Sequence, residues 1–259
     1  RGLGDVYKRQ AQSRAMMALL DEAQKATGVP VVELVRRRDL DGAIFKRLVE
    51  KGLIFLFKQD PWMSGSEEKG LPLATLSPAQ QTALDAIRQG MGEKGLVLLE
   101  GVTGSGKTEV YTHLIHDVLA SGRDALFLVP EIALTTQLIV RLRRFFGDRL
   151  EVYHSRFTPR ERTTTFRRVA EEKGKGRLLV GARSAVFLPF RNLGLIVVDE
   201  EHDPSYKQQD PAPRYQARDA AAMLGHLHGA QVLLGSATPS LEARWAVGQD
   251  LSLIHISEP

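Results

Sequence analysis

One short segment limits the fold of this chain more than any other feature. Residues 101–108 read Gly-Val-Thr-Gly-Ser-Gly-Lys-Thr and fit the phosphate-binding pattern G-x-x-x-x-G-K-[ST]. The apolar run 96–99 precedes this segment and the amphipathic stretch 109–115 follows it. Because such a loop joins a buried strand to the N-terminus of a helix, the pattern predicts an α/β domain that binds a nucleoside triphosphate.

The loop has an explicit chemistry. Its glycines let main-chain N–H groups converge on phosphate oxygens, while the following helix directs its positive end at the same anion. We expect Lys107 to reach the β- and γ-phosphates and the hydroxyl of Thr108 to ligate Mg²⁺. The predicted nucleotide-binding residues of the loop are Gly101, Thr103, Gly104, Ser105, Gly106, Lys107 and Thr108.

Composition narrows the class of protein. The 259 residues carry a formal net charge of +4, which slightly favours anionic partners, and they include no Cys. A disulfide framework and a thiolate zinc site are therefore excluded from this chain. No apolar run approaches the roughly 20 residues of a membrane span, and the N-terminus lacks the layout of a secretion signal. We expect a cytoplasmic protein with no membrane contact.

A change in character at 61–70, where turn formers and charges replace periodic apolar residues, predicts a linker. Upstream, residues 11–60 have the outline of a small winged-helix module, with helices at 31–38 and 42–52 and a strand at 53–58. Ile44, Phe45, Leu48 and Val49 form the apolar face of the second helix. The basic residues of this module either follow DNA phosphates or form a solvated helix face.

Downstream of the linker, short apolar runs alternate with helical patterns. The expected strands are 96–99, 125–129, 178–180, 195–198 and 232–234, and the expected helices include 134–146 and 159–171. Continuous apolar runs of this length suit strands that are buried on both faces of a parallel sheet. Residues 71–247 are therefore predicted to form a doubly wound P-loop domain whose ligands bind at the carboxyl ends of the strands.

One of these strands ends in a charged cluster, Asp-Glu-Glu-His at 199–202. Asp199 is placed to hold the Mg²⁺ of a bound nucleotide, and Glu200 to orient and deprotonate the attacking water. The alternative for Asp199 is a helix N-cap. For Glu201 taken alone, a solvated turn is the favoured interpretation.

The P-loop, Asp-Glu-Glu-His and Gly235-Ser-Ala-Thr-Pro-Ser240 together resemble the first motor lobe of superfamily 2 helicases. More narrowly, residues 101–111, 129–135, 181–187 and 203–208 resemble segments of the PriA family of bacterial primosomal replication-restart helicases, in family order. The resemblance covers essentially residues 71–247. It implies a RecA-like domain and an ATP-dependent helicase that moves 3′ to 5′ on single-stranded and forked DNA, with primosome proteins and single-strand-binding protein as partners.

The resemblance also suggests roles for individual residues. Gln80 falls where such helicases read adenine, although Ser77, Pro78 and Gln80 equally fit a helix capping box. His202, Ser236 and Thr238 resemble the elements that couple hydrolysis to DNA contact. Thr238, which precedes Pro239, is also a plausible helix N-cap.

Residues 205–219 interleave aromatic rings with cations and are broken by prolines, which predicts an exposed loop followed by a helix. Rings stack on single-stranded bases and cations bind phosphate. By resemblance this is the aromatic-rich loop that links DNA binding to ATP hydrolysis, although an ordinary surface loop fits as well. The expected DNA-binding residues here are Tyr206, Lys207, Arg214 and Tyr215; Gly181, Arg183 and Ser184 resemble the part that grips the sugar-phosphate backbone.

The chain also departs from the family pattern. Thr136 stands where Pro is expected, and a second motor lobe, cysteine-ligated zinc and an additional N-terminal DNA-binding domain are missing. We therefore expect an internal fragment that is not a competent helicase alone. Residues 1–10 and 248–259 contain sequence that resembles translated adapter sequence, and we leave them out of the fold.

Two other functions stay open. A P-loop ATPase switch that is not coupled to DNA would share the loop and the carboxylates but would have no use for the aromatic-rich segment. A DNA-binding fragment that is inert toward ATP would depend on the basic module at 11–60. The pair His226 and His228 does not share a helix face and receives no role.

Overall fold

The computed structural model of the chain describes residues 71–154, 157–171, 175–247 and 252–256, together with the isolated residues Met17, Phe45 and Leu48. By its contacts the chain divides into two units, Arg1–Asp60 and Pro61–Pro259. Phe45 and Leu48, from the predicted apolar face of the first unit, are helical and buried. The remainder of the predicted winged-helix module, the linker and the tail 1–10 lie outside the described residues.

A sheet of seven strands forms the centre of the second unit, and every strand pairing within it is parallel. Its order is β3-β4-β2-β5-β8-β1-β9. The strands are β1 (Leu96–Gly101), β2 (Asp124–Leu128), β3 (Leu150–Tyr153), β4 (Leu178–Gly181), β5 (Leu193–Val198), β8 (Gln231–Ser236) and β9 (Ser252–Ile256). The five predicted strands are confirmed with ends that differ by up to two residues, whereas β3 was not predicted.

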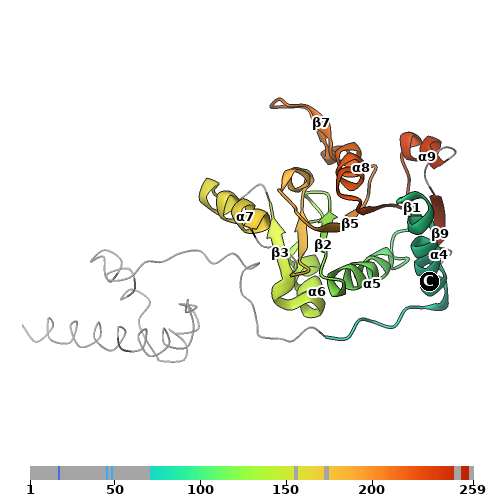
Figure 1. Ribbon diagram of the computed structural model, residues 1–259, viewed down its shortest axis with the longest axis horizontal. Coiled ribbons are helices and arrows are strands. Elements are labelled where there is room, and N and C mark those ends of the chain that lie inside the picture. The colour runs from blue at the N-terminus through green and yellow to red at the C-terminus, as the bar shows by residue number, and fades with distance from the viewer. Residues whose placement is uncertain are drawn as a thin grey trace, which may run out of the picture. The chain divides into compact units, whose positions relative to one another are not determined.

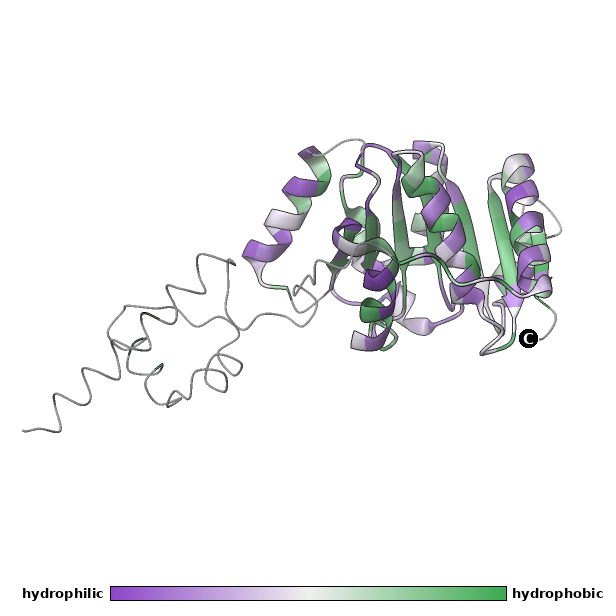
Figure 2. Cartoon of the chain, turned by 90° about the horizontal axis from the view of Figure 1, so that it is seen from below, coloured by the Kyte–Doolittle hydropathy of each residue, from purple (hydrophilic) through white to green (hydrophobic). Residues whose placement is uncertain are grey.

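Helices cover both faces of this sheet (Figure 1). On one face lie α4 (Pro78–Lys94), α5 (Lys107–Ala120) and α6 (Thr136–Phe146); on the other lie α7 (Pro159–Glu171), α8 (Ala217–His228) and α9 (Leu241–Val247). Val97 and Leu99 pack into the first core and Leu98 into the second, so the strands are apolar on both sides. Figure 2 shows these hydrophobic strands between amphipathic helices. The doubly wound prediction is confirmed.

The beginnings of two helices explain local features of the sequence. Ser77 caps α4 in a capping box with Gln80, which was the alternative interpretation of these residues. Helix α6 begins at Thr136, two residues later than expected, because the Thr135 hydroxyl accepts a hydrogen bond from the amide of Leu138. Thr136 is thus the first helical residue, a position that favours Pro but accepts other residues, so its departure from the family pattern is structurally mild.

The residues that we left out of the fold at the C-terminal end include strand β9, which pairs with β1 from Val97↔Ser252 to Gly101↔Ile256. Burial alternates along this segment, with Leu253 and His255 exposed, and Ile256 is buried in the core under α4 and α5. Leaving Ser252–Ile256 out of the fold was therefore wrong for this structure. The adapter origin of 248–259 stays a prediction.

Three short 3₁₀ turns, η1 (Gly147–Arg149), η2 (Arg183–Phe187) and η3 (Pro204–Tyr206), connect the larger elements. After η3 the chain forms an antiparallel hairpin of β6 (Lys207–Gln208) and β7 (Tyr215–Gln216), which projects from the domain beside α8 (Figure 1). The predicted exposed loop is thus a hairpin, and the predicted helix follows it. Among the described residues, no helix combines the length and the apolar character that crossing a membrane requires.

Candidate functional site

The P-loop has the geometry that its sequence predicts. Strand β1 ends at Gly101 and α5 begins at Lys107, while Gly104 and Gly106 have φ values of 87° and 81° that glycine adopts without strain. A Cβ atom on Gly101 would lie 2.7 Å from Ser105 Oγ, so the turn has no room for a side chain there. The buried Ser105 hydroxyl has no hydrogen-bond partner among the described residues. Lys107 Nζ donates to the Gly101 carbonyl at 2.7 Å.

Gln80 is in contact with this loop as well as with its own helix. Its side-chain oxygen accepts a hydrogen bond from the amide of Ser77, and its side-chain nitrogen donates to the Ser105 carbonyl at 3.3 Å. The capping box therefore exists, and the same side chain also borders the P-loop. Contact with adenine stays a prediction.

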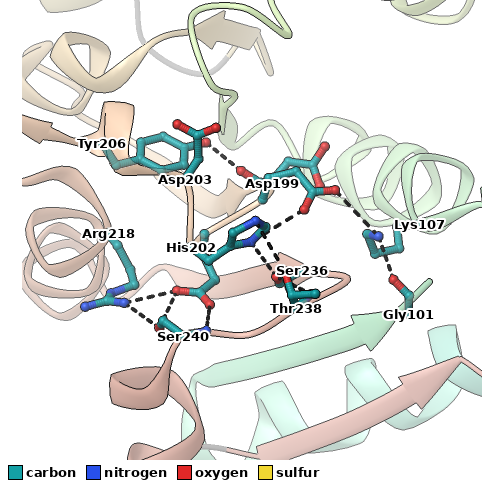
Figure 3. A network of polar contacts seen from close by, with 12 residues as sticks. Gly101, Lys107, Asp199, His202, Asp203, Tyr206, Arg218, Ser236, Thr238 and Ser240 are labelled. Carbon is teal, nitrogen blue, oxygen red and sulfur yellow. Dashed lines mark hydrogen bonds and ion pairs between the residues drawn. The ribbon is translucent and has the colours of Figure 1, made fainter. Parts of the chain in front are cut away.

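The predicted catalytic carboxylates lie opposite Lys107, at the carboxyl end of β5 (Figure 3). Glu200 Oε1 is 3.7 Å from Lys107 Nζ. Glu200 has φ 47° and is the one described residue other than glycine in the left-handed region. Such a conformation costs on the order of 1–3 kcal/mol, and its surroundings must hold it. Asp199 does not cap a helix, because its amide donates to Leu128 O and a turn follows.

Asp199 has an unusual electrostatic environment. Loss of solvent and the neighbouring charge of Glu200 raise its pKa from 3.8 to about 6, against a hydrogen bond from Tyr111 and the attraction of Lys107. The Tyr111 hydroxyl donates to Asp199 Oδ1 at 3.1 Å. Burial, followed by the Asp199 charge, raises the pKa of Tyr111 well above 10, so this phenol keeps its proton. A cation bound beside this pair of carboxylates would favour the ionised form of Asp199 and lower its pKa.

These residues fit a magnesium ion that is held mainly by a nucleotide. In the described part of the chain, no group of three His, Cys, Asp or Glu side chains could hold a metal. Mg²⁺ typically takes one or two protein ligands and completes its shell with phosphate oxygens and water. Thr108 and Asp199 remain the residues that we expect to hold it.

A chain of hydrogen bonds joins the end of β5 to the segment after β8. His202 Nδ1 lies 2.7 Å from Ser236 Oγ and 3.7 Å from Glu200 Oε2. Ser236 Oγ also accepts a hydrogen bond from the amide of Thr238, whose hydroxyl lies 3.3 Å from His202 Nε2. The structure therefore brings together His202, Ser236 and Thr238, whose coupling role was suggested by resemblance. Thr238 is not a helix N-cap, since Ser240 Oγ accepts the amide of Ala243 at the start of α9.

The environment of Glu201 differs from the one that we expected from the sequence. We favoured a solvated turn, but its exposed fraction is 0%. Its carboxylate accepts hydrogen bonds from Arg218 Nη1 at 3.0 Å and from the amide of Ser240 at 2.7 Å. Burial alone would lower the pKa of Arg218, but hydrogen bonds to Glu201 and Asp219 raise it. Glu201 is thus a buried, fully paired carboxylate.

The segment at 181–184 is turned toward the protein. A Cβ atom on Gly181 would lie 2.7 Å from Tyr153 O, so close packing already requires glycine. Arg183 donates through Nη1 to the carbonyl of Ser205 at 3.0 Å and to that of Lys207 at 3.4 Å. Ser184 is half-buried on η2. Arg183 therefore braces the hairpin, and backbone contact with DNA stays a prediction for all three residues.

The predicted DNA-binding residues in and beside the hairpin fall into two groups, which differ in exposure to solvent. Lys207 and Arg214 are exposed and, with Tyr215, line a groove of about 730 Å³. The Tyr215 ring packs edge-on against the exposed Phe187, with ring centroids 4.7 Å apart. Tyr206 has an exposed fraction of 0%, and its hydroxyl donates to the Asp199 carbonyl at 2.6 Å. Tyr206 therefore contacts the catalytic turn and presents no ring for stacking.

Four residues of this site carry contacts that our sequence reasoning did not assign: Tyr111, Glu201, Arg218 and Ser240. Tyr111 follows Lys107 by one helical turn, so the spacing could have placed it at the same edge of the sheet. Arg218 offered no comparable signal, because its partner lies 17 positions away in the chain.

Comparisons with known proteins give one family. Residues 77–244 match the family model of the DEAD/DEAH box helicases. The Replication restart protein PriA of Bacillus subtilis (strain 168) is 40% identical over 255 residues, covering 95% of this chain and 31% of that protein. The protein of the same name from Chlamydia pneumoniae is 47% identical over 170 residues, covering 65% of this chain and 22% of that protein. The chain thus spans less than a third of these relatives.

A solved structure supports the fold. RecG bound to a three-way DNA junction matches with a TM-score of 0.51 and 22% sequence identity, covering 85% of this chain and 26% of that chain. At this identity the likeness bears on the fold alone.

Proposed function

The chain belongs to the DEAD/DEAH box helicase family, and on this premise we propose that it is the first motor lobe of an ATP-dependent DNA helicase that acts in replication restart. The observation that carries the proposal is the convergence of Lys107 and the pair Asp199 and Glu200 at one edge of the sheet, next to the hydrogen-bonded His202 and Ser236. A phosphate-binding lysine, a metal-binding carboxylate and a candidate base meet where such sheets bind their ligands.

In the proposed mechanism, the P-loop amides and Lys107 bind the phosphates of ATP, and Gln80 contacts the adenine. Thr108 and Asp199 would hold the Mg²⁺ that accompanies ATP, which would supply positive charge beside the phosphates. Lys107 moves from the Gly101 carbonyl to the β- and γ-phosphates when ATP enters, because the anion is the stronger partner. Glu200, 3.7 Å from Lys107 before this movement, then orients the attacking water and accepts its proton.

We propose that single-stranded DNA binds along the hairpin and the segment 181–184. The exposed cations Lys207 and Arg214 contact phosphates and Tyr215 stacks on a base. His202, Ser236 and Thr238 link this contact to Glu200 through the hydrogen bonds described above. Movement in the 3′ to 5′ direction on forked DNA, and assembly with primosome proteins and single-strand-binding protein in the bacterial cytoplasm, belong to the same proposal by family resemblance.

The 259-residue chain by itself is proposed to bind ATP weakly, to hydrolyse it slowly and to unwind no DNA. In this mechanism the transition-state charge requires a cation from a second motor lobe. The zinc that the resemblance implies for longer family members has no thiolate ligand in this chain, which contains no Cys.

The test compares ATP hydrolysis by this chain and by a longer version that continues into a second motor lobe, with and without single-stranded DNA. We expect slow turnover by this chain, much faster turnover by the longer version with further stimulation by DNA, and loss of turnover in Glu200→Gln. Equal, DNA-independent hydrolysis by both versions would instead favour an ATPase switch. If Lys107→Ala leaves nucleotide binding unchanged, the P-loop assignment fails.

A further inference from the structure

A second polar cluster joins Glu201, a residue of the catalytic turn at 199–202, to Arg218 and Ser240, which are labelled in Figure 3. Ser240 donates to Glu201 from its amide at 2.7 Å and from its hydroxyl at 2.9 Å. Arg218 Nη1 donates to Glu201 Oε2 at 3.0 Å and to Ser240 Oγ at 2.7 Å. Both oxygens of this carboxylate therefore accept hydrogen bonds from directed donors, and the Glu201 side chain is closed off from solvent.

The three residues come from three segments that are distant in the sequence. Glu201 lies in the turn that follows β5, next to Glu200 in the chain. Its amide donates a hydrogen bond to the Gly235 carbonyl at 3.0 Å. Arg218 is the second residue of α8, the helix that begins where the hairpin ends. Ser240 precedes α9 and follows the segment that contacts His202. A displacement of the hairpin that moves the start of α8 is therefore passed directly to the catalytic turn by the Arg218 side chain.

The backbone of the turn links the position of Glu201 to the direction of the Glu200 side chain. Glu200 is held at φ 47°, and the residue beside it is anchored by Arg218 and Ser240. With Glu201 fixed on one side, the carboxylate of Glu200 is directed to the other side, toward Lys107. A small rotation of the anchored residue changes the direction of Glu200, because the two share a peptide unit.

Stability alone is a weak reason for such a pair. Taking two charges out of water roughly cancels their attraction, so a buried ion pair is typically no more stable than apolar residues of similar size. The exposed pair Arg88–Asp117, with an N–O distance of 2.6 Å, joins α4 to α5 without burial of either charge. The buried contacts of Glu201 instead fix the geometry of the turn.

We propose that Glu201 and Arg218 are positioning residues that transmit the state of the DNA-binding hairpin to Glu200 and Lys107. The proposal depends on the proposed function, since it requires both ATP and DNA to bind. It adds the physical connection through which one ligand alters the affinity of the other.

Linkage gives a test that needs no hydrolysis, because a coupling between two ligands appears equally in either affinity. The 259-residue chain is titrated with a non-hydrolysable ATP analogue and Mg²⁺, in the presence and absence of a saturating oligo-dT strand. The measured quantity is the ratio of the two nucleotide dissociation constants. Allosteric couplings typically amount to about 5- to 150-fold.

Glu201→Gln is the mildest variant. The amide keeps an oxygen for the Ser240 amide, and Arg218 keeps Asp219, 3.0 Å from its Nε. A second variant, Glu201→Gln with Arg218→Met, removes both charges together, so that no unpaired charge stays buried. Arg88→Gln, which disrupts an exposed pair between two helices, is the matched control.

We expect a ratio clearly different from one in the unmodified chain and in Arg88→Gln, and a ratio near one in both Glu201 variants, whose affinities for each ligand alone stay within about threefold. Retention of the ratio in the Glu201 variants would overturn the proposal. A ratio of one in the unmodified chain would also overturn it, while hydrolysis by the longer version would still support the proposed function. Absence of nucleotide binding would defeat both.

Discussion

The P-loop edge of the sheet, where Lys107 faces Glu200, and the aromatic-rich segment 205–219 were both predicted from sequence patterns, but the structure agrees with the two patterns to different degrees. At the P-loop, each patterned residue lies where the pattern requires, with Gly104 and Gly106 in the left-handed region and Lys107 opening α5. In the aromatic-rich segment, the two tyrosines have different environments, since Tyr206 in η3 is buried and Tyr215 in the hairpin lines the groove. A motif that specifies backbone geometry therefore transfers to structure more faithfully than one that specifies composition.

The largest effect is expected at the P-loop edge. Glu200→Gln should lower ATP turnover by about 10²- to 10⁴-fold in the version with a second lobe, because a positioned base contributes that much to proton transfer. Nucleotide affinity should change by less than tenfold, since Lys107 and the loop stay intact. Turnover and binding of a nucleotide analogue check this. A variant that keeps its turnover would remove Glu200 from the mechanism and weaken the contrast between the two regions.

A second prediction uses the raised pKa of Asp199. Between the usual value of 3.8 and the folded value of about 6, the folded chain holds this proton more tightly than the unfolded chain. The stability contributed by this difference is present at low pH and is lost as pH rises through about 6. Asp199→Asn should therefore raise the free energy of unfolding at pH 8 by up to about 3 kcal/mol and leave it nearly unchanged at pH 3.5.

Denaturant unfolding of the two chains at both pH values, without nucleotide or Mg²⁺, measures this difference. A matched control is Asp85→Asn, which removes an exposed carboxylate on α4. If Asp199→Asn is no more stable than the unmodified chain at pH 8, the electrostatic description of the site is wrong.

The third prediction addresses the two tyrosines directly. Tyr206→Phe leaves the Asp199 carbonyl without its hydroxyl partner and should cost about 1–3 kcal/mol of folding free energy, with no loss of DNA affinity at equal folded fraction. Tyr215→Ala should instead weaken single-stranded DNA binding by about 1–3 kcal/mol. Fluorescence anisotropy with oligo-dT and thermal unfolding separate the two effects. Equal loss of DNA affinity in both variants would erase the distinction that the structure draws.

The smallest effect concerns the exposed cations of the hairpin. If Lys207 neutralises one phosphate of single-stranded DNA, Lys207→Gln should reduce the slope of log affinity against log salt by about 0.7. Arg214→Gln should act similarly, because both side chains are exposed and line the same groove. Glu131→Gln, on an exposed residue between β2 and α6, serves as the comparison. An unchanged slope in both hairpin variants would place the DNA elsewhere.

Local sequence was sufficient for much of the fold. Five strands and the boundaries of α7 followed from apolar runs and helical spacing, because a buried parallel strand needs apolar residues on both faces. Strand β3 was missed because its four residues include Glu151 and alternate in burial. Ser252–Ile256 was left out because its sequence resembles an adapter, yet the segment pairs with β1 as an edge strand whose side chains alternate in burial.

The sequence by itself determined the loop, the strand and the helix that cradle phosphate, since these depend on glycine geometry and on contacts within a few residues of one another. Only the tertiary structure decided that Tyr206 faces inward and that Glu201 meets Arg218 and Ser240. These contacts join residues from separate elements, and whether a polar side chain is buried depends on which donors the rest of the chain brings to it. Composition reports that a carboxylate is present, while its partners decide whether it reacts or anchors.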